Sequence, residues 1–429
     1  MATAGDNAPG KKATGMNSPT MPAVVIGIDT PIGLAIIRDL GERGVRVFGI
    51  ARGPDAIGLS SRFLEQGMLR ANDAEGLIQQ LENLTKELGV ACLFAISESD
   101  IELLNRHRNR LTGYRFVFAD ADRMERVLNK KLTCMAAASV GIRVPRTEQI
   151  SSLADAHALL HELHYPVVLK WSNPNDVIQL LLGAGLTLDK AHYCHSAAEL
   201  LEYLAPYEKV ERYPLIQEYC VGFGLAQIIL MHQGIPVYTF QHQRLHEWPP
   251  EGGFSTLCTS IDPSQHPELM AKSIALLQVL EWDGVAMVEY RHDPASGESA
   301  FMEINGRFWG SLPLACHAGA TFPWFGYQLE GMRQAIHQTA YKDGVRCRFI
   351  IPETKRLFRL LFQQKMVADK SLKFNRAEEL ISYLLEFVRP RGCYYVFQWR
   401  DPMPVFTDAI QNARRLLPGS LRKKFIRNG

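Results

Sequence analysis

The segment 285–310, VAMVEYRHDPASGESAFMEINGRFWG, places two glutamates, an asparagine and an arginine at spacings that suit metal-ion chemistry. Its pattern predicts two β-strands joined by a polar turn at 293–297, because aspartate, proline and glycine favour turns. Ser296 lies midway between Glu289 and Glu303, so a hairpin folded about it brings the two glutamates opposite each other. Directly opposed side chains have Cβ atoms about 5 Å apart, where like charges repel.

Asn305 shares a face with Glu303, because successive side chains of a strand alternate between the two faces of a sheet. Arg307 follows on the same face if the strand continues. Two carboxylates and an amide oxygen that converge on one point suit a hard divalent cation such as Mg²⁺, with Mn²⁺ as an alternative. A surface hairpin with solvated acids is the other interpretation, but the asparagine and arginine in register favour a metal site formed by Glu289, Glu303 and Asn305.

The elements that must position this hairpin begin with an alternation of strands and helices from residue 22. Strands are predicted for the apolar segments AVVIGI (23–28), VRVFGI (45–50), ACLFAI (91–96) and RFVFAD (115–120). Thr30-Pro31 predicts the start of the first helix, since threonine caps helices and proline suits the first helical position. The alternation predicts an open parallel α/β sheet of the doubly wound type, with ligand-facing loops at the carboxyl ends of its strands.

Two loops of this sheet carry polar residues that could contact a ligand. Ser97-Glu98-Ser99-Asp100 directly follows the strand 91–96, and Ser99 or Asp100 is also expected to cap the next helix. Ser60-Ser61-Arg62 is a candidate anion-binding loop, and the Pro/Gly-rich stretch 247–256 is expected to form a loop over the cleft. The absence of a GxGxxG motif argues against an NAD site.

Two lysines occupy positions that could bind phosphate. Lys130 lies in the first turn of a helix predicted over 129–140, and Lys170 closes the apolar strand predicted over 165–171. Lysines bind phosphate as mobile point charges, and a charged residue closing such an apolar run is not expected to be plain core. Taken alone, each would more simply be a surface lysine.

Further strands and helices follow along the chain. Strands are predicted at 214–220 and in a hairpin formed by 226–231 and 236–245, and helices are predicted at 196–204 and about 267–281. The strand at 214–220 precedes a glycine-containing bend, where backbone groups can hydrogen-bond a purine edge. Glu218 could accept a hydrogen bond from an exocyclic amine.

Taken together and in this order, these segments resemble the ATP-grasp superfamily. The matching segments are NK with Gly141 downstream (129–141), YPVVLK (165–170), LIQEY (215–219), HQR (242–244), Glu289 and MEINGR (302–307). The resemblance runs from about residue 22 to 330. The segment MEINGRFWGSLPLA is most similar to predicted carboxylate–amine ligases related to biotin carboxylase and carbamoyl-phosphate synthetase.

The resemblance implies a division of the chain into three parts. A pre-ATP-grasp α/β domain would cover residues 22–125. A two-subdomain α+β ATP-grasp domain would cover 126–339, with its lid subdomain at about 145–215. Beyond the resemblance, the sequence after about residue 340 becomes basic, aromatic and helical, which predicts a mainly helical C-terminal extension over 340–429.

The resemblance also implies roles for individual residues. Lys130 and Lys170 would contact the phosphates of ATP. Adenine would be held by Gln217, Glu218 and Tyr219, and Mg²⁺ by Glu289, Glu303 and Asn305. Arg307 would stabilise the acyl phosphate or the transferring phosphoryl group. His242 and Arg244 match positions that face phosphate or acceptor, with His242 assigned to ATP binding and Arg244 to catalysis; a structural histidine and a strand-end surface arginine are the alternatives.

One segment departs from the family pattern. The family usually has a glycine-rich loop after the second lysine, which covers the phosphates with backbone N–H groups. Here the segment 171–190 contains only Gly183 and Gly185, well after Lys170. A lid of different shape is therefore expected.

The composition of the 429 residues excludes several other classes of protein. The formal net charge of +2 gives no overall field for nucleic acid or membrane surfaces. The eight cysteines have no CxxC pair and no His/Cys zinc spacing, which argues against a structural zinc site or a disulfide framework and favours a reducing compartment. No apolar run approaches the roughly 20 residues of a transmembrane helix, and the N-terminus lacks the pattern of a signal peptide. We therefore expect a cytoplasmic protein, and a homodimer is left open.

Both ends of the chain are expected to be solvated. Residues 1–21 are small, polar and rich in proline and glycine, which predicts disorder. The last residues carry basic side chains with no nearby acid: Arg414, Arg415, Arg422, Lys423, Lys424 and Arg427. A solvated tail is favoured over contact with an anionic surface.

The expected activity is ligation of a small-molecule carboxylate to an amine, dependent on ATP and Mg²⁺, through an acyl phosphate. One alternative is a carboxylase that phosphorylates bicarbonate, although no biotinyl-carrier motif AMKM is present. The other is a non-catalytic nucleotide-binding scaffold with a degenerate lid. The opposed glutamates argue against a scaffold, because a pure scaffold has no need to keep like charges in opposition.

Overall fold

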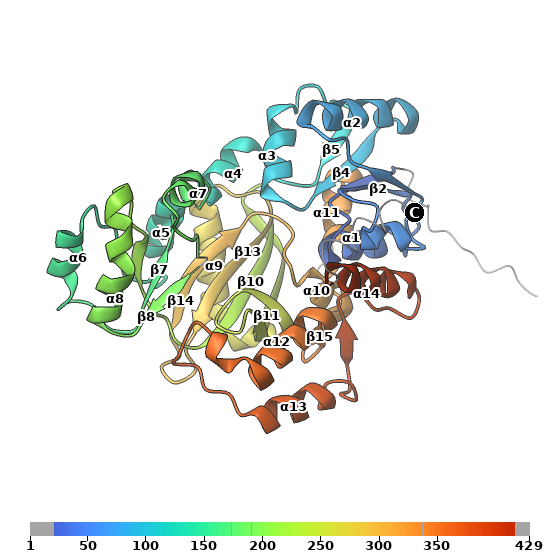
Figure 1. Ribbon diagram of the computed structural model, residues 1–429. Helices are drawn as coiled ribbons and strands as arrows, with labels where there is room; N and C mark the ends of the chain where they lie inside the picture. The colour runs from blue at the N-terminus through green and yellow to red at the C-terminus, as the bar shows by residue number, and fades with distance from the viewer. Residues whose placement is uncertain (1–20, 173, 190, 337–338, 417–429) are drawn as a thin grey trace, which may run out of the picture.

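The structure is a computed structural model that describes residues 21–172, 174–189, 191–336 and 339–416. Three sheets of five, seven and four strands organise this part of the chain. Figure 1 shows the five-stranded sheet at the upper right, the seven-stranded sheet in the centre and the four-stranded sheet on the left. The mixed α/β architecture confirms the fold class expected from the sequence.

The five-stranded sheet is parallel and has the strand order β3–β2–β1–β4–β5. Its strands are β1 (Ala23–Ile26), β2 (Val47–Ala51), β3 (Gln66–Leu69), β4 (Ala91–Ala95) and β5 (Tyr114–Phe116). Its helices are α1 (Pro31–Gly41), η1 (Ile57–Ser60), α2 (Ala74–Leu88), α3 (Glu98–Arg106) and α4 (Ala121–Leu128). The strand order reverses between β1 and β4, so the loops after these two strands flank the crevice where such sheets bind ligands.

Helix caps in this sheet follow local sequence signals. Thr30 caps α1 as expected, and Pro31 is the first residue of the helix. The cap of α3 is Ser97, whose Oγ accepts from the backbone N–H of Asp100 at 3.2 Å. The prediction that Ser99 or Asp100 would cap this helix was therefore wrong, because the helix begins earlier, at Glu98.

The four-stranded sheet has the order β6–β9–β7–β8. Its strands are β6 (Thr147–Glu148), β7 (Val167–Lys170), β8 (His192–Cys194) and β9 (Leu215–Glu218), and its helices are α6 (Leu153–Leu159), α7 (Pro174–Gly183), α8 (Ala197–Leu204) and η2 (Ala205–Val210). Helix α7 lies in the segment 171–190 that follows Lys170. The expectation of a lid of different shape stays a prediction. The buried apolar residues of this sheet form two clusters of their own.

The seven-stranded sheet has the order β14–β13–β10–β11–β12–β15–β16, antiparallel except for the last pair. Its strands are β10 (Phe223–His232), β11 (Ile235–Trp248), β12 (Phe254–Ser260), β13 (Gly284–His292), β14 (Ser299–Asn305), β15 (Arg346–Arg348) and β16 (Gly392–Tyr394). Helices α5 (Lys130–Ser139), η3 (Pro263–Gln265), α9 (Pro267–Val279), α10 (Leu312–Ala318), α11 (Phe322–Gly326) and the π-helical turn η4 (Tyr327–Gly331) accompany it. Two buried apolar clusters run from this sheet into the five-stranded sheet.

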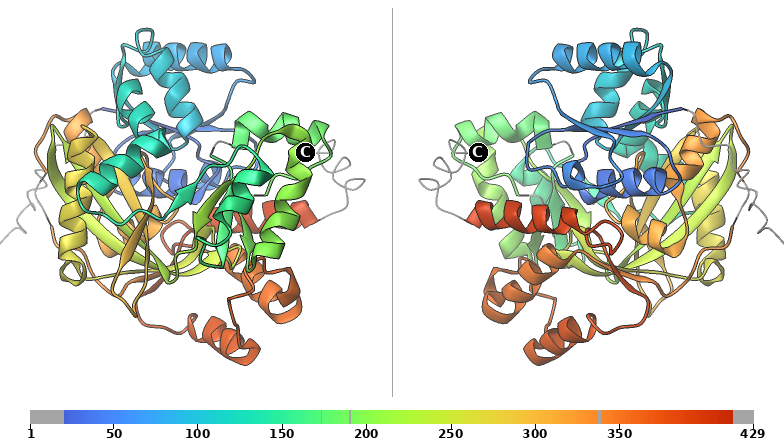
Figure 2. Two further views of the ribbon diagram at one scale, coloured as in Figure 1. Left: turned by 90° about the vertical axis from the view of Figure 1, so that its left-hand side faces the viewer. Right: turned by 90° about the vertical axis from the view of Figure 1, so that its right-hand side faces the viewer.

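The C-terminal extension contains α12 (Ile350–Phe362), η5 (Gln364–Met366), α13 (Arg376–Leu385) and α14 (Met403–Leu416). It also supplies β15 and β16, so two short strands join the central sheet in an extension that is otherwise helical. The right-hand view of Figure 2 shows α14, in red, lying beside the blue helix α1 of the N-terminal domain.

Asp401 anchors the extension to the N-terminal domain. Its carboxylate accepts hydrogen bonds from Arg38 Nε at 2.9 Å, from Ser61 Oγ at 2.7 Å and from the backbone N–H of Arg62 at 2.9 Å. The loop Ser60-Ser61-Arg62 therefore binds an anion within the protein, and that anion is a carboxylate of the same chain.

The chain ends partly follow the expectations. Met21, predicted to belong to a disordered tail, is ordered, and its carbonyl accepts a hydrogen bond from Tyr327 Oη at 2.6 Å. Arg414 pairs with Asp55 at 2.7 Å. The other predicted tail residues, 1–20 and Arg422, Lys423, Lys424 and Arg427, lie outside the described residues. Across the described ranges, no helix combines the length and apolar character that crossing a bilayer requires.

Candidate active site

Glu289 on β13 and Glu303 on β14 are directly opposed, as the hairpin pattern predicted. A bulge between Glu289 and Tyr290 displaces the pairing on the side nearer the turn by one residue. A hairpin centred on Ser296 therefore gives the correct pairing for Glu289 and Glu303, which lie beyond the bulge as seen from the turn. The pairs nearer the turn are displaced from it by one residue.

Asn305 joins the two glutamates on the same face of the sheet. Its Nδ2 donates to Glu289 Oε1 at 3.0 Å and to Glu303 Oε1 at 3.3 Å. Half a turn of the amide would present its oxygen instead, which is the atom that a hard cation binds. Burial raises the pKa of Glu289, Arg244 opposes this shift, and the charge of Glu303 adds to it. The donor set fits Mg²⁺.

Arg244 reaches Glu289 across an intervening strand. Ala226 of β10 pairs with Glu289 on one side and with His242 on the other. Gly224 lies on the same face, and a Cβ built on it would be 2.8 Å from Arg244 Cδ. These two small residues leave a path along which Arg244 Nη2 approaches Glu289 Oε1 to 2.5 Å.

Glu247 and Arg291 extend this contact into a chain of alternating charges. Glu247 Oε1 lies 3.3 Å from Arg244 Nη1, and its Oε2 lies 2.9 Å from Arg291 Nη2. The order Glu289, Arg244, Glu247, Arg291 gives every buried charge a partner of opposite sign. Such pairing is required, because a buried charge without a partner costs several kcal/mol (about 3–5).

Lys170, at the end of β7, brings a positive charge from the four-stranded sheet to the hairpin. Its Nζ donates to Gln217 Oε1 at 3.2 Å. Burial lowers the pKa of Lys170, the charge of Glu303 acts in the opposite direction, and the charges of Lys130 and Arg291 lower it further. Lys170 therefore interacts electrostatically with two other cations and with Glu303, and a polyphosphate with a divalent ion would need such positive charge around it.

The side chains of the expected adenine segment are engaged within the protein. Glu218 accepts from the guanidinium of Arg143 and from the backbone N–H of Arg146, the latter at 3.0 Å. Tyr219 Oη donates to Asp369 Oδ2 at 2.8 Å. Because the Glu218 carboxylate already has donors, we expect contacts to adenine here to come chiefly from backbone groups.

His242 lies inside the sheet. Its side chain is fully buried, and Nε2 is 3.0 Å from Ser311 Oγ. Burial, with a smaller contribution from Arg244, lowers the pKa of His242 to about 3, so the imidazole is neutral. Within the described chain, Nδ1 has no hydrogen-bond partner. The contacts place His242 beside Arg244 at the floor of the site, and a direct contact with ATP stays a prediction.

Arg307 links the hairpin to the five-stranded sheet. Its Nε lies 3.2 Å from Oε1 of Glu98, the first residue of α3. In the same turn of α3, Asp100 pairs with Arg52 at 3.0 Å and with Arg70. The polar loop after β4 therefore meets the end of β14, where it could contact a substrate bound next to Arg307.

No family model matches the chain, and no curated protein matches it. Solved structures do. The L-amino acid ligase from Bacillus licheniformis superposes with a TM-score of 0.53 and 16% identity, over 72% of this chain and 74% of that one. The ADP complex of N5-carboxyaminoimidazole ribonucleotide synthetase superposes with a TM-score of 0.58 and 16% identity, over 81% of this chain and 88% of that one.

A third similar structure is the biotin carboxylase domain dimer of the Hydrogenobacter thermophilus 2-oxoglutarate carboxylase, in complex with magnesium ADP, ADP and bicarbonate. It superposes with a TM-score of 0.57 and 13% identity, over 76% of this chain and 73% of that one. This chain has the ATP-grasp fold. Identities this low establish the fold of the chain and leave its activity to its own residues.

Two residues of this candidate site were not found from the sequence. Arg291 could have been found, because it stands two residues after Glu289 and strand alternation puts both on one face. Glu247 could not, because bulges on either side of His246 change the facing of the residues after Arg244. The loop expected at 247–256 is also shorter than predicted, since β11 continues to Trp248.

Proposed function

We propose that the protein is a ligase that joins a carboxylate to an amine through an acyl phosphate, using ATP and Mg²⁺. One observation carries the proposal: Glu289 and Glu303 face each other, and Asn305 donates hydrogen bonds to both. The charge of Glu303 also acts on Lys170, which belongs to another sheet. Hard oxygen donors beside clustered cations suit a magnesium-bound polyphosphate. The ADP and the magnesium ADP named for two similar structures agree with this choice of ligand.

Each charged residue takes a role that follows from its place. Mg²⁺, held by the two glutamates and the asparagine, supplies positive charge that offsets the negative charge developing on the phosphates. Lys130 and Lys170 hold phosphate oxygens as point charges. Arg244 is a positioning residue, because it fixes the carboxylate of Glu289. Arg307 stabilises the phosphoryl group during transfer.

The reaction has two steps. A substrate carboxylate oxygen attacks the γ-phosphorus of ATP, the bond from that phosphorus to the ADP oxygen breaks, and an acyl phosphate forms. The amine nitrogen then attacks the acyl carbon, inorganic phosphate leaves, and the nitrogen loses a proton. The four-stranded sheet must close before the first step, because water would hydrolyse the acyl phosphate.

The acceptor side of the site lies between Arg307 and the loop after β4. Positive charge is available there from Arg307 and Arg52, and negative charge from Glu98 and Asp100. In this proposal a substrate carboxylate binds next to Arg307, and the amine approaches from the side of Glu98. The pairing of Arg307 with Glu98 would then exchange for contacts with substrate.

Acceptor-dependent release of ADP tests the proposal. The protein is incubated with Mg-ATP and a panel of carboxylic acids and amines, alone and in pairs, and ADP, phosphate and the amide product are measured. A ligase releases ADP and phosphate in equal amounts and forms an amide only when acid and amine are both present. Release driven by bicarbonate alone would indicate a carboxylase, and ATP binding without any release would indicate a scaffold.

The variant Glu303→Gln should abolish this turnover. The Glu303 side chain is exposed, so the fold should be nearly unchanged while one charged metal ligand is lost. Glu268→Gln, which changes an exposed glutamate at the start of α9, is the matched control and should keep full activity. Wild-type turnover by Glu303→Gln would refute the assignment of the metal site.

A further inference from the structure

Three cysteines lie in one row across neighbouring strands of the central sheet. Cys258 on β12 pairs with Cys347 on β15, and Cys347 pairs with Cys393 on β16. Side chains of directly paired residues stand on the same face of a sheet, so the three thiols project to one side. Local spacing in the sequence could not predict this row, because the three cysteines are far apart along the chain.

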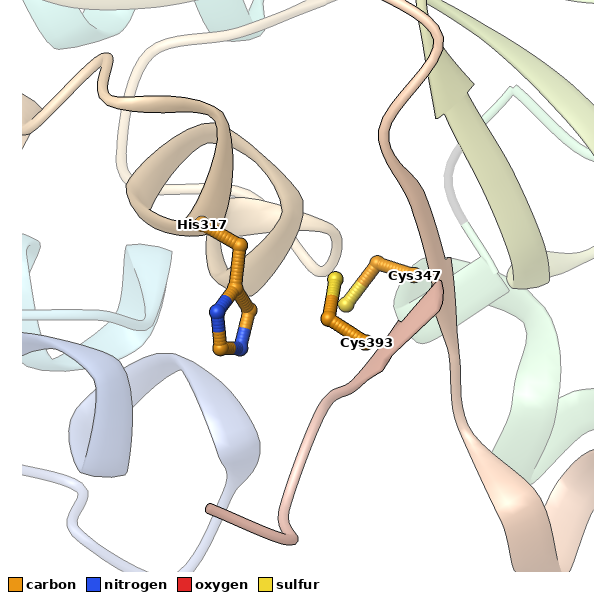
Figure 3. Close-up of side chains that lie close together, drawn as sticks. All are labelled: His317, Cys347 and Cys393. Carbon is orange, nitrogen blue, oxygen red and sulfur yellow. The ribbon is translucent and has the colours of Figure 1, made fainter. Parts of the chain in front are cut away.

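His317 approaches the same face from helix α10, which packs against β12, β15 and β16. One nitrogen of its ring and the sulfurs of Cys347 and Cys393 all lie within 4.8 Å of one another. Figure 3 shows the two sulfurs next to each other, with the imidazole alongside. Cys347 is fully buried, and the other two side chains are partly buried.

Hydrogen bonds show which atoms of the cluster already have partners within the protein. Cys258 Sγ lies 3.1 Å from Tyr395 Oη, so this thiol is engaged at the far end of the row. His317 Nε2 lies 3.2 Å from the carbonyl oxygen of Tyr394, and Cys393 Sγ lies 3.1 Å from that of Arg346. Both carbonyl oxygens belong to half-buried residues, Tyr394 on the edge strand β16 and Arg346 on β15. These two hydrogen bonds involve neither His317 Nδ1 nor the thiol of Cys347.

We propose that His317, Cys347 and Cys393 bind one zinc ion. Two thiolates and an imidazole are the ligands that Zn²⁺ prefers, at about 2.3 Å for sulfur and about 2.0 Å for nitrogen. Tetrahedral zinc with these distances needs its ligand atoms roughly 3.5 Å apart, which small side-chain rotations would achieve from the present separations. Local spacing along the chain contains no zinc motif, because the fold brings the three ligands together from distant segments.

His317, one of the three proposed ligands, also lines a cavity of about 560 Å³. Its lining includes Cys316, His317 and Tyr395, together with residues of α1. Zinc with three protein ligands and access to a cavity can complete its shell with water or a small anion. The site is separate from the magnesium site, whose donors are oxygen atoms of β13 and β14.

Zinc at this place would fasten the C-terminal extension to the catalytic core. Cys347 and Cys393 belong to the extension, whereas His317 belongs to α10, which follows the loop that carries Arg307. Because the ligands come together only in the folded chain, zinc should stabilise that state. The proposal does not depend on the ligase activity and can fail without affecting it.

Cobalt substitution tests the site in the full-length protein. The protein is treated with chelator and a phosphine reductant and titrated with Co²⁺. One equivalent should produce thiolate-to-cobalt charge-transfer absorption with tetrahedral d–d bands, and one equivalent of Zn²⁺ should remove them. The oxygen donors of the magnesium site cannot produce the thiolate absorption, so the two sites are distinguished.

Variants of the ligands give the second arm of the test. Cys393→Ser and His317→Asn change partly buried residues and should weaken binding at least about tenfold. Cys134→Ser, which changes a partly buried cysteine on α5, should bind like the wild type. Zn²⁺ should raise the Tm of the wild type by at least about 3 °C and leave that of Cys393→Ser unchanged. Circular dichroism confirms that each variant is folded.

Three results would overturn the proposal. The first is the absence of thiolate-to-cobalt absorption. The second is equal binding by the wild type, Cys393→Ser and His317→Asn, which would place the metal elsewhere. The third is a disulfide between Cys347 and Cys393 that persists in the reductant. It would be detected because neither cysteine is alkylated and the mass of the pair is two hydrogens below that of the unalkylated dithiol, and it would make the pair a covalent cross-link instead of a metal site.

Discussion

At the scale of single residues, the site consists of charges that are stable only in combination. The buried carboxylate of Glu289 is held by Arg244, which in turn is shared with Glu247. Burial lowers the pKa of Lys170, and the negative charge of Glu303 raises it. A magnesium-bound nucleotide would add both negative and positive charge to this set. Binding of Mg²⁺ and binding of the nucleotide should therefore depend on each other.

The variant Lys170→Ala should bind ATP more weakly. Removal of a charge-assisted contact to phosphate costs about 1.5–3 kcal/mol, which corresponds to an increase in Kd of roughly ten- to a hundredfold. Isothermal titration calorimetry with a non-hydrolysable ATP analogue and Mg²⁺ measures the change. Lys86→Ala, at an exposed position on α2, is the control. Unchanged affinity in Lys170→Ala would remove this lysine from the site.

Asp39 offers a test of buried charge outside the site. Burial raises its pKa to about 6, against the opposing effect of Arg43, from 3.8 as the ordinary value. The folded state therefore holds the proton more tightly than the unfolded state. The stability that this gives is complete below about pH 4 and is lost as the pH rises through 6.

The variant Asp39→Asn lacks this titration. From pH 4 to pH 7, its unfolding free energy should therefore rise relative to that of the wild type, by up to about 3 kcal/mol, since one pKa unit corresponds to about 1.4 kcal/mol. Urea unfolding at the two pH values measures the difference. Asp176→Asn, an exposed substitution on α7, should show none. A difference that does not change with pH would contradict the raised pKa of Asp39.

At the scale of elements, the interior strand β10 controls the geometry of the site through two small residues. Its residues Gly224 and Ala226 lie between the strand that carries Arg244 and the strand that carries Glu289. A larger residue at either position would block the reach of the arginine. The site thus depends on the small size of Gly224 and Ala226 as much as on the charged residues of the neighbouring strands.

The variant Gly224→Ala should displace Arg244. The new Cβ would lie 2.8 Å from Arg244 Cδ and 3.2 Å from Glu247 Oε1, and the arginine is held at its far end by two carboxylates. Overpacking of this kind costs about 1–3 kcal/mol, and we expect turnover to fall at least about tenfold. Steady-state kinetics and urea unfolding measure both effects. Gly183→Ala, with open space around it, is the control, and equal kinetics in the two variants would refute the role of Gly224.

At the scale of the whole molecule, the sheets divide into one shared body and one separate body. The five- and seven-stranded sheets share their buried apolar clusters, whereas the four-stranded sheet has clusters of its own. A sheet with a separate core can move without disrupting the rest, as closure over ATP requires. The C-terminal extension binds the shared body through Asp401 and contacts the four-stranded sheet through Tyr219 and Asp369.

The variant Asp401→Ala should loosen the extension. It leaves Arg38 buried without its partner, and breaking a buried ion pair costs about 3–5 kcal/mol. Limited proteolysis should therefore cut the variant faster than the wild type within residues 340–416, which mass spectrometry of the fragments would show. Asp343→Ala, at an exposed position, is the control. Equal cleavage of Asp401→Ala and the wild type would show that Asp401 is not the anchor.

The sequence by itself determined the features that depend on neighbouring residues. Strand alternation and a turn signal were enough to predict the opposition of Glu289 and Glu303 and the facing of Asn305, because a hairpin is a local structure. The same reasoning predicted four of the five strands of the parallel sheet, all but β3, and the cap of α1. These elements are encoded within stretches of a few dozen residues.

Only the tertiary structure decided which distant residues meet. Arg244 reaches Glu289 over β10, Glu247 turns inward at two bulges, and the carboxylate of Asp401 fills the loop at Ser61. The row of cysteines near His317 likewise depends on the order of strands in the central sheet. Strand order and bulges are set by how whole layers pack, and packing joins residues whose separation along the chain carries no local signal.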